Sequence, residues 1–178
     1  MYRTLMSAAA LLLMAGCATV DISQPPLAVT PIDGAGAVGI DVYARERARG
    51  AAVPVFRGQK TVEVRTFGNR AGSGYGEIAA ASCTLDSGLY RAAFMTPVNI
   101  VVPDYGPNSP AIFVQCTHDG KRASVTVNAV NLTMQARSAS AAGTGVLGAI
   151  VIGAVNESRR NNDTDDFGYN PIRVNFDQ

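Results

Sequence analysis

The stretch AIFVQCTHDGKRASVTV, residues 111–127, contains two alternating segments on either side of a turn signal. In each segment every second residue is apolar or small, which is typical of a half-buried strand because successive side chains point to opposite faces. Asp119-Gly120 lies between the segments and is a preferred dipeptide of two-residue hairpins. The stretch therefore predicts an antiparallel hairpin. Its inward-facing residues are expected to be Ile112, Val114, Cys116, Ala123, Val125 and Val127.

The same period of two recurs along most of the chain after residue 50. Gly, Pro, Asn and Asp clusters bound the segments, as expected for short strands joined by turns. One cluster, the Gly-rich run 68–76, predicts a flexible hairpin loop. The pattern predicts a mainly β fold: a small antiparallel β-sandwich formed by a single domain, residues 51–178. The other alternating residues are Val62 and Val64; Ala81, Cys83 and Leu85; Val98, Ile100 and Val102; and Ile172, Val174 and Phe176.

The first 16 residues have the composition of a secretory signal peptide. Arg3 supplies a positive charge, an apolar run of about ten residues follows, and small residues precede Cys17. The run is too short to span a membrane, which takes roughly 20 apolar residues. Residues 1–16 are therefore predicted to be removed on export.

Met14-Ala15-Gly16-Cys17 resembles the lipobox of bacterial lipoproteins, with Met where Leu is usual. The resemblance implies cleavage before Cys17, acylation of its thiol and a stable lipid anchor, since two or more acyl chains hold a protein at a membrane where one does not. Ala18 in place of Asp implies the outer rather than the inner membrane, with the domain facing the periplasm. The alternative is an ordinary cleavable signal in which Cys17 plays no part.

Two cysteines remain once Cys17 is assigned to lipid. Cys83 and Cys116 share their strand faces with apolar residues, so both sulfurs are predicted to point into the core. An exported protein meets an oxidising compartment, which favours a disulfide between them. Two free buried thiols and a catalytic thiol are the alternatives.

Residues 17–50 are predicted to form a tether behind the lipidated cysteine. Five Pro and Gly residues between positions 25 and 36 interrupt any helix or central strand. Residues 41–50, with three arginines, predict a short exposed helix or a solvated strand end. After removal of the signal the chain has 14 basic and 14 acidic side chains, so no basic stripe indicates nucleic-acid binding.

A longer segment, residues 61–130, resembles the PEGA-like domains of envelope and surface proteins. The similarity lies in Cys83-Thr84-Leu85, in Thr96-Pro97-Val98 with the strand that follows, and in the strand ending near Gly120. The Pro-Glu-Gly-Ala signature itself is absent. The resemblance implies a small β-sandwich on display at the cell envelope, and it implies no catalytic residues.

The apolar segment 141–155 has small residues at every fourth position. On a helix this spacing would form a strip that permits close backbone contact with another element. We weigh three interpretations: a helix buried across the sheet, a membrane-touching or self-associating hairpin, and a mobile loop. The strip consists of Ala141, Gly145, Ala149 and Gly153.

Motifs for chemistry are sparse. His118 is the single histidine, no Gly-x-Ser-x-Gly element occurs, and no Gly-Lys-Ser/Thr follows the Gly-rich run. Asp163, Asp165 and Asp166 do not fit the spacing of an EF-hand, and we expect a solvated acidic loop there rather than a calcium site. No metal and no cofactor beyond the covalent lipid at Cys17 are predicted.

Two functional hypotheses follow. The first is a non-enzymatic envelope lipoprotein whose domain binds an envelope protein or itself, the latter through residues 141–155. The second is a small-ligand carrier or enzyme with a pocket between the sheet and the Gly-rich segment, which needs convergent polar groups. Its candidate residues are Tyr90, Arg91, Asp104 and Tyr105.

Overall fold

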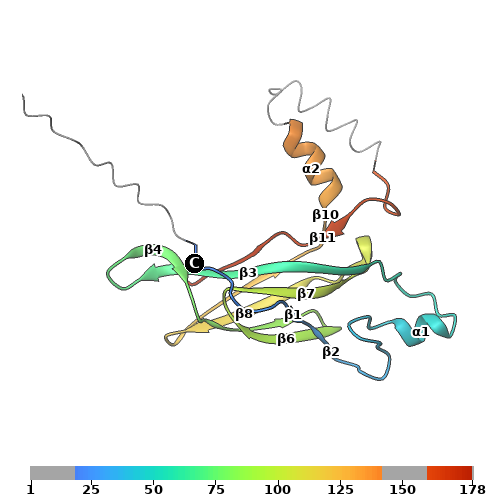
Figure 1. The fold of residues 1–178 in the computed structure, drawn as a ribbon, viewed down its shortest axis with the longest axis horizontal. Coiled ribbons are helices and arrows are strands. Elements are labelled where there is room, and N and C mark those ends of the chain that lie inside the picture. Colours follow the sequence, from blue (N-terminus) through green and yellow to red (C-terminus); the bar gives the residue numbers. More distant parts are fainter. Residues whose placement is uncertain (1–18, 142–159, 178) are drawn as a thin grey trace, which may run out of the picture.

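The computed structural model describes residues 19–141 and 160–177. Two five-stranded sheets pack face to face into a sandwich (Figure 1). The first sheet has the order β1 (Leu27–Ala28), β7 (Val98–Asp104), β3 (Gly58–Arg70) and β12 (Ile172–Asn175), with β4 (Gly74–Ile78) also paired to β3. The second has the order β2 (Thr30–Pro31), β6 (Tyr90–Met95), β5 (Ser82–Asp86), β8 (Ile112–His118) and β9 (Lys121–Val127).

Most neighbouring strands are antiparallel, and β1 with β7 and β12 with β3 are parallel. A small hairpin-like pair, β10 (Val130–Asn131) and β11 (Phe167–Gly168), lies apart from the two sheets. The helices of the described residues are α1 (Ala44–Ala48), the 3-10 turn η1 (Gly106–Asn108) and α2 (Leu132–Ala141). The predicted mainly β sandwich is confirmed. No helix of the described ranges is both long and apolar enough to cross a membrane.

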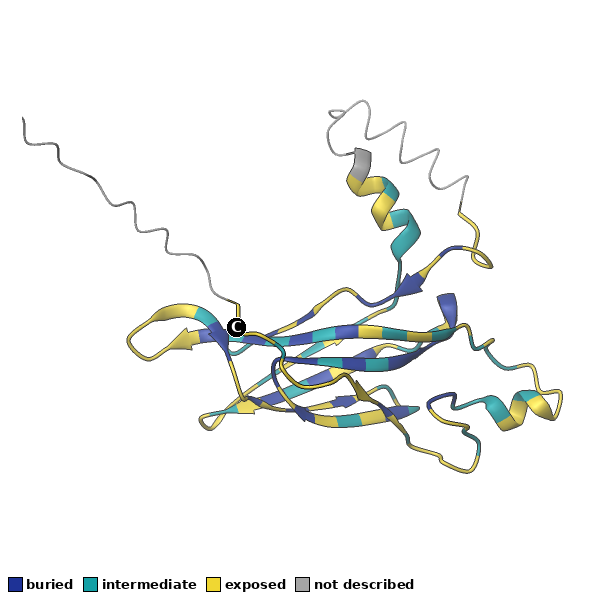
Figure 2. Cartoon of the chain, viewed as in Figure 1, coloured by how far each residue is buried: buried dark blue, intermediate teal, exposed yellow. Residues whose placement is uncertain are grey.

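The core forms between the inward faces that the alternation predicts. The predicted members from β3, β5, β7 and β8 are all buried, and those of β9 are half-buried because β9 is the last strand of its sheet. Figure 2 shows the resulting alternation of buried and exposed residues along the strands. Branched aliphatic side chains suit this pleated, closely packed surface. In β12 both Ile172 and Val174 are buried, while Phe176 beyond it is half-buried.

The hairpin predicted at Asp119-Gly120 is present. Both residues have positive φ angles, 47° and 75°, which is the backbone of a type I′ turn. His118 and Lys121 pair directly across it. The Gly-rich run also forms a hairpin, but its predicted loop is shorter than expected, because β3 and β4 continue through the paired residues Gly68 and Gly76.

The predicted tether is wrong over residues 27–31. Leu27 pairs with Ile100 in the first sheet, and Thr30 pairs with Arg91 in the second. Between them the side chain of Val29 is 3% exposed. The segment closes the side of the sandwich between β7 and β6. Proline favours extended backbone and is tolerated in edge strands, so the composition that indicated a tether also suits this position.

Residues 41–50, which follow this segment, are also bonded to the sandwich. The helical alternative for residues 41–50 is confirmed by α1. Arg47 forms an ion pair of 2.8 Å with Asp41, which is 7% exposed. Burial alone would raise the pKa of Asp41, but hydrogen bonds from Arg47 and the Tyr43 amide outweigh it and hold the pKa below its ordinary value. Tyr105 also donates to Asp41, over 3.2 Å.

Candidate functional site

Val20, three positions after Cys17, is fixed on the outer surface of the first sheet. Its N–H donates to Oε2 of Glu77 over 2.9 Å, and its carbonyl accepts from Nη1 of Arg65 over 2.7 Å. Arg65 is itself paired with Glu77 and with Glu63, each at 2.6 Å. Both polar groups of the Val20 peptide backbone are thus held. We call Val20, Glu63, Arg65 and Glu77 the N-terminal clamp.

The pairing of β3 with β4 builds this clamp. Glu63 and Arg65 are two residues apart on β3 and so share its outer face, and Phe67 is opposite Glu77. Arg65 therefore reaches Glu77 diagonally, a distance that long side chains span. Hydrogen bonding to Glu63 raises the pKa of Arg65 above its ordinary value. The Glu77 side chain is 5% exposed, which makes its charge-assisted bonds less accessible to water.

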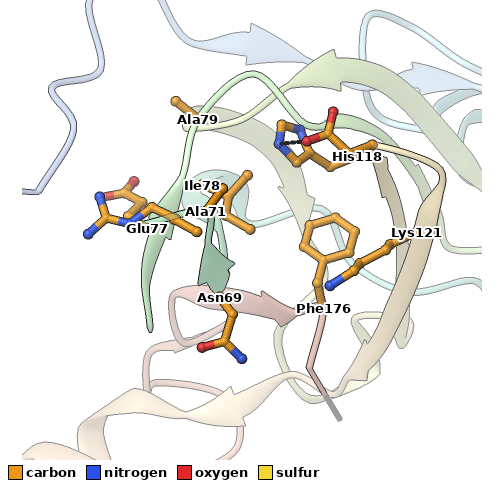
Figure 3. A pocket seen from close by; sticks show the side chains of 10 residues that line it. Asn69, Ala71, Glu77, Ile78, Ala79, His118, Lys121 and Phe176 are labelled. Carbon is orange, nitrogen blue, oxygen red and sulfur yellow. Dashed lines mark ion pairs between the residues drawn. The ribbon is translucent and has the colours of Figure 1, made fainter. Parts of the chain in front are cut away.

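A pocket of about 350 Å³ adjoins the clamp. It lies between the β3–β4 hairpin and the β8–β9 turn (Figure 3). Ile78 and Phe176 give it apolar surface, and the polar residues come from both hairpins. The residues that line it are Asn69, Arg70, Ala71, Glu77, Ile78, Ala79, His118, Asp119, Lys121 and Phe176.

Two ion pairs beside this pocket are long. His118 Nε2 lies 3.4 Å from Asp119 Oδ2, and Lys121 Nζ lies 3.5 Å from Asp177 Oδ1. Arg70 takes part in none of the ion pairs of the described residues. The site therefore offers cationic groups next to an apolar surface, which suits binding of an amphiphile with an anionic group. The sequence alone does not indicate this site, because its walls come from hairpins about 50 residues apart in the chain.

Cys83 and Cys116 form the predicted disulfide. They are directly opposite each other on β5 and β8, with their Cα atoms 4.1 Å apart. Both side chains are buried, at 2% and 0% exposed, as the strand parity predicts. The bond lies in the core, where it joins two neighbouring strands. Cys17 lies outside the described residues.

Tyr90, Arg91, Asp104 and Tyr105 are the four candidates for a pocket between the sheet and the Gly-rich segment, most of which lies outside the described residues. Tyr90 is buried, and its hydroxyl lies 3.4 Å from that of Tyr169; burial raises its pKa. Asp104 accepts from the Gly106 N–H, and Tyr105 is buried beside Asp41. Arg91 is exposed on β6. Three of the four thus serve packing and turn formation.

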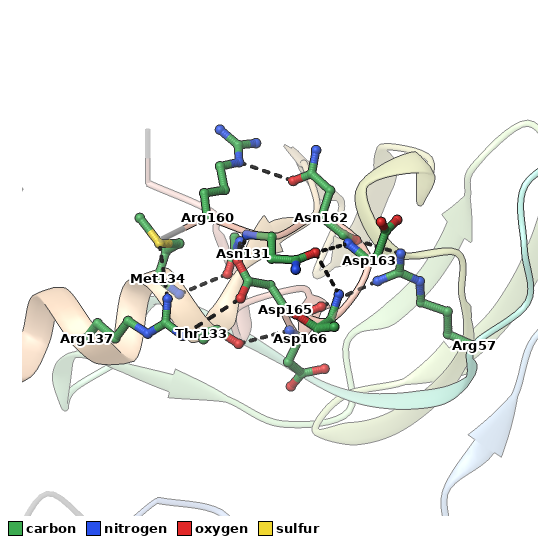
Figure 4. A network of polar contacts seen from close by, with 12 residues as sticks. Arg57, Asn131, Thr133, Met134, Arg137, Arg160, Asn162, Asp163, Asp165 and Asp166 are labelled. Carbon is green, nitrogen blue, oxygen red and sulfur yellow. Dashed lines mark hydrogen bonds and ion pairs between the residues drawn. The ribbon is translucent and has the colours of Figure 1, made fainter. Parts of the chain in front are cut away.

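The predicted solvated acidic loop is wrong for Asp165, which is 5% exposed and belongs to the network of polar contacts in Figure 4. Its carboxylate accepts from Asn131 Nδ2 at 2.7 Å and from the Asn161 N–H at 3.0 Å. The hydrogen bond from Asn131 is the main reason that the pKa of Asp165 lies below its ordinary value. Asn131 also caps α2 by accepting from the Met134 N–H. Asp163 and Asp166 are exposed as predicted.

This network joins the two ends of a long segment, residues 132–166, that leaves the sandwich and returns to it. The chain leaves through β10 and α2 and returns through β11, and Asn131 pairs with Phe167. Arg57 donates to the carbonyl of Asn162 over 2.6 Å, which attaches the return to the sandwich. Ala141 is the last residue of α2, whereas Gly145, Ala149 and Gly153 lie outside the described residues.

Comparisons with known proteins give no family. No protein-family model matches the chain, and neither a curated protein nor a solved structure matches it at a significant level. Within residues 19–141 and 160–177 no three His, Cys, Asp or Glu side chains gather as metal ligands.

Proposed function

We propose that the chain is an exported lipoprotein, anchored through acyl groups on Cys17, whose sandwich acts as a non-enzymatic interaction module at the membrane surface. The signal-like residues 1–16 and the lipobox-like Met14-Ala15-Gly16-Cys17 support the anchor. The buried disulfide supports export, because such bonds persist in oxidising compartments.

The observation that carries the proposal is the N-terminal clamp. It fixes Val20 by both its N–H and its carbonyl, only three residues after the proposed lipid attachment. Three extended residues reach at most about 11 Å. A lipid on Cys17 would therefore hold the clamp end of the sandwich against the membrane rather than on a long tether. In this arrangement the β3–β4 hairpin and the β8–β9 turn lie closest to the lipid.

Partner contacts are expected through the segment 132–166. Asp165 and the β10–β11 pair join the two ends of this segment, so it leaves and rejoins the sandwich at one place. Segment 141–155 carries the apolar, small-residue composition that suits contact with an envelope protein or a second copy of the chain.

The anchor is tested by metabolic labelling with radioactive palmitate, comparing the native chain with a Cys17→Ser variant. Cys83 and Cys116 remain in both, so the two proteins differ at the lipidation position alone. We expect label in the native chain and its partition into the detergent phase, with neither in the variant. Equal labelling of both, or of neither, would contradict the proposal.

A small-ligand carrier is the second candidate function. The pocket beside the clamp favours it, since about 350 Å³ is at the lower end of the usual range for ligand sites. Its place differs from the one predicted between the sheet and the Gly-rich segment.

A further inference from the structure

We propose that the pocket beside the N-terminal clamp binds the phosphodiester of a membrane phospholipid. This rests on the proposed function, because an anchor at Cys17 would bring the pocket to the lipid surface. It adds a ligand class and named contacts. Arg70 and Lys121 hold the phosphate from the two hairpins, and the glycerol and first acyl carbons pack on Ile78 and Phe176.

Arg70 is placed for this role by the absence of a side chain at Gly76. A Cβ built on Gly76 would lie 2.6 Å from Nη2 and 2.7 Å from Cζ of Arg70. Gly76 is opposite Gly68, on the strand that pairs with β3. The guanidinium can therefore lie flat over the hairpin. Its planar fork of donors matches a phosphate in two-point geometry.

Lys121 and His118 line the same pocket as Arg70, from the other hairpin. Figure 3 shows Lys121, His118 and Phe176 on one side of the pocket, with Ala71 and Ile78 opposite. The Lys121 side chain is 61% exposed and its contact with Asp177 is long, so an incoming phosphate competes for Lys121 with a carboxylate that also accepts from the Asn69 N–H. His118 packs with its ring centre 6.1 Å from that of Phe176.

The carboxylates around the pocket define the head group further. Glu77 is occupied by Arg65 and Val20 and offers no free oxygen. Asp119, 87% exposed, stands at the rim beside His118. A zwitterionic head group places its ammonium near Asp119 while its phosphate meets Arg70 and Lys121. The mixed charge thus favours phosphatidylethanolamine over a purely anionic lipid.

The test is a titration followed on the ring resonance of His118, which is unique because the chain has one histidine. The purified untagged full-length protein is held in non-ionic detergent and titrated with dihexanoyl-phosphatidylethanolamine. Inorganic phosphate and dihexanoylglycerol are titrated in parallel. We expect a saturable shift with the phospholipid and at least about tenfold weaker binding of the other two, since each lacks one half of the contacts.

Four variants sharpen the result. Arg70→Gln and Lys121→Gln should each weaken phospholipid binding about tenfold, the usual scale for losing a hydrogen bond to a charged group. Gly76→Ala keeps every charge but displaces the Arg70 guanidinium, and it should weaken binding in the same direction. Arg122→Gln is the matched control: Arg122 is exposed on β9, outside the pocket lining, and its loss should leave affinity unchanged.

An unmoved His118 resonance, unchanged affinity in Arg70→Gln, or inorganic phosphate binding as tightly as the phospholipid would each overturn the lipid site. The lipid anchor is judged separately, because monomeric lipid reaches the pocket whether or not Cys17 is acylated. Absent palmitate label with a positive titration removes the anchor alone. Full label with a negative titration removes the lipid site alone.

Discussion

Glu77→Gln should release Val20 from the sandwich. In the native chain Oε1 of Glu77 meets Arg65 at 2.6 Å and Oε2 meets the Val20 N–H at 2.9 Å, so both oxygens accept. Glutamine has one acceptor oxygen, and its NH₂ group would face a donor on one side. The side chain is 5% exposed, so water replaces the lost bond poorly.

The expected cost follows from that geometry. An unmade hydrogen bond at a buried charged site costs about 1–3 kcal/mol. Arg65 keeps its second partner, Glu63, at 2.6 Å, so the cost should not reach that of an isolated buried charge. A loss of about 1–3 kcal/mol corresponds to a roughly 5- to 150-fold change in a local equilibrium. Exchange of the Val20 amide hydrogen should accelerate by this factor, because local opening governs exchange.

Amide hydrogen exchange resolved by NMR measures this effect, with Glu63→Gln as the matched control. Glu63 carries the same charge and bonds the same arginine, but its side chain is 39% exposed, and the Val20 N–H donates to Glu77 instead. That control should change stability by less than about 1 kcal/mol and leave Val20 protected. A Val20 amide that exchanges as in an unstructured chain in the native protein would refute the clamp. Equal exchange in native and Glu77→Gln proteins would refute it as well.

Three further predictions concern the fold that carries this site. Replacing Cys83 and Cys116 by alanine should lower the free energy of unfolding in urea by about 3–4 kcal/mol, the chain-entropy value for a separation of 33 residues; an unchanged midpoint in the variant would contradict it. Asp41 has a lowered folded-state pKa, so the stability that it contributes is complete above its unfolded-state pKa of about 3.9 and is lost as the pH falls through the folded value. Thermal melts from pH 7 to pH 2 should therefore show a smaller loss in Asp41→Asn, and equal slopes would argue against the Asp41 contacts. Asn131→Ala removes the cap of α2 and the nearest donor to Asp165, and circular dichroism should report loss of helix with a destabilisation of about 1–2 kcal/mol; a variant as helical and stable as the native chain would count against the network.

The features predicted correctly from the sequence are those that depend on the local alternation of apolar and polar residues. The inward faces of the strands, those of Cys83 and Cys116 included, and the turn at Asp119-Gly120 follow from periods of two and from turn chemistry. These signals lie within each strand or its immediate neighbour. They were therefore accessible without knowledge of the topology.

Placement of the N-terminal segment depends on distant residues. The bond between Val20 and Glu77 joins positions 57 residues apart, and Leu27 pairs with Ile100. Locally the Pro-rich segment indicates only extended backbone, which a free tether and an edge strand share. The segment becomes an edge strand only where another strand offers unpaired backbone N–H and C=O groups. The composition of the segment itself carries no information about that strand.

In the hairpin at 68–76, Gly72 and Gly74 adopt the positive φ angles of the turn, 74° and 67°, whereas Gly68 and Gly76 permit close approach. A Cβ at Gly68 would lie 2.9 Å from Cδ1 of Ile78 and 3.2 Å from Cβ of Phe176. At Gly76 the space is taken by Arg70. The neighbours that fill these spaces come from other strands. The pocket was invisible in the sequence for the same reason.

The central claim is that Cys17 carries the anchor of a sandwich clamped at Val20. Mass spectrometry of the intact protein extracted from membranes tests it most directly. We expect a chain that begins at Cys17 and bears a diacylglycerol-sized addition on its N-terminal peptide. A mature chain that begins at another residue, or one in which Cys17 is an unmodified thiol, would contradict the account.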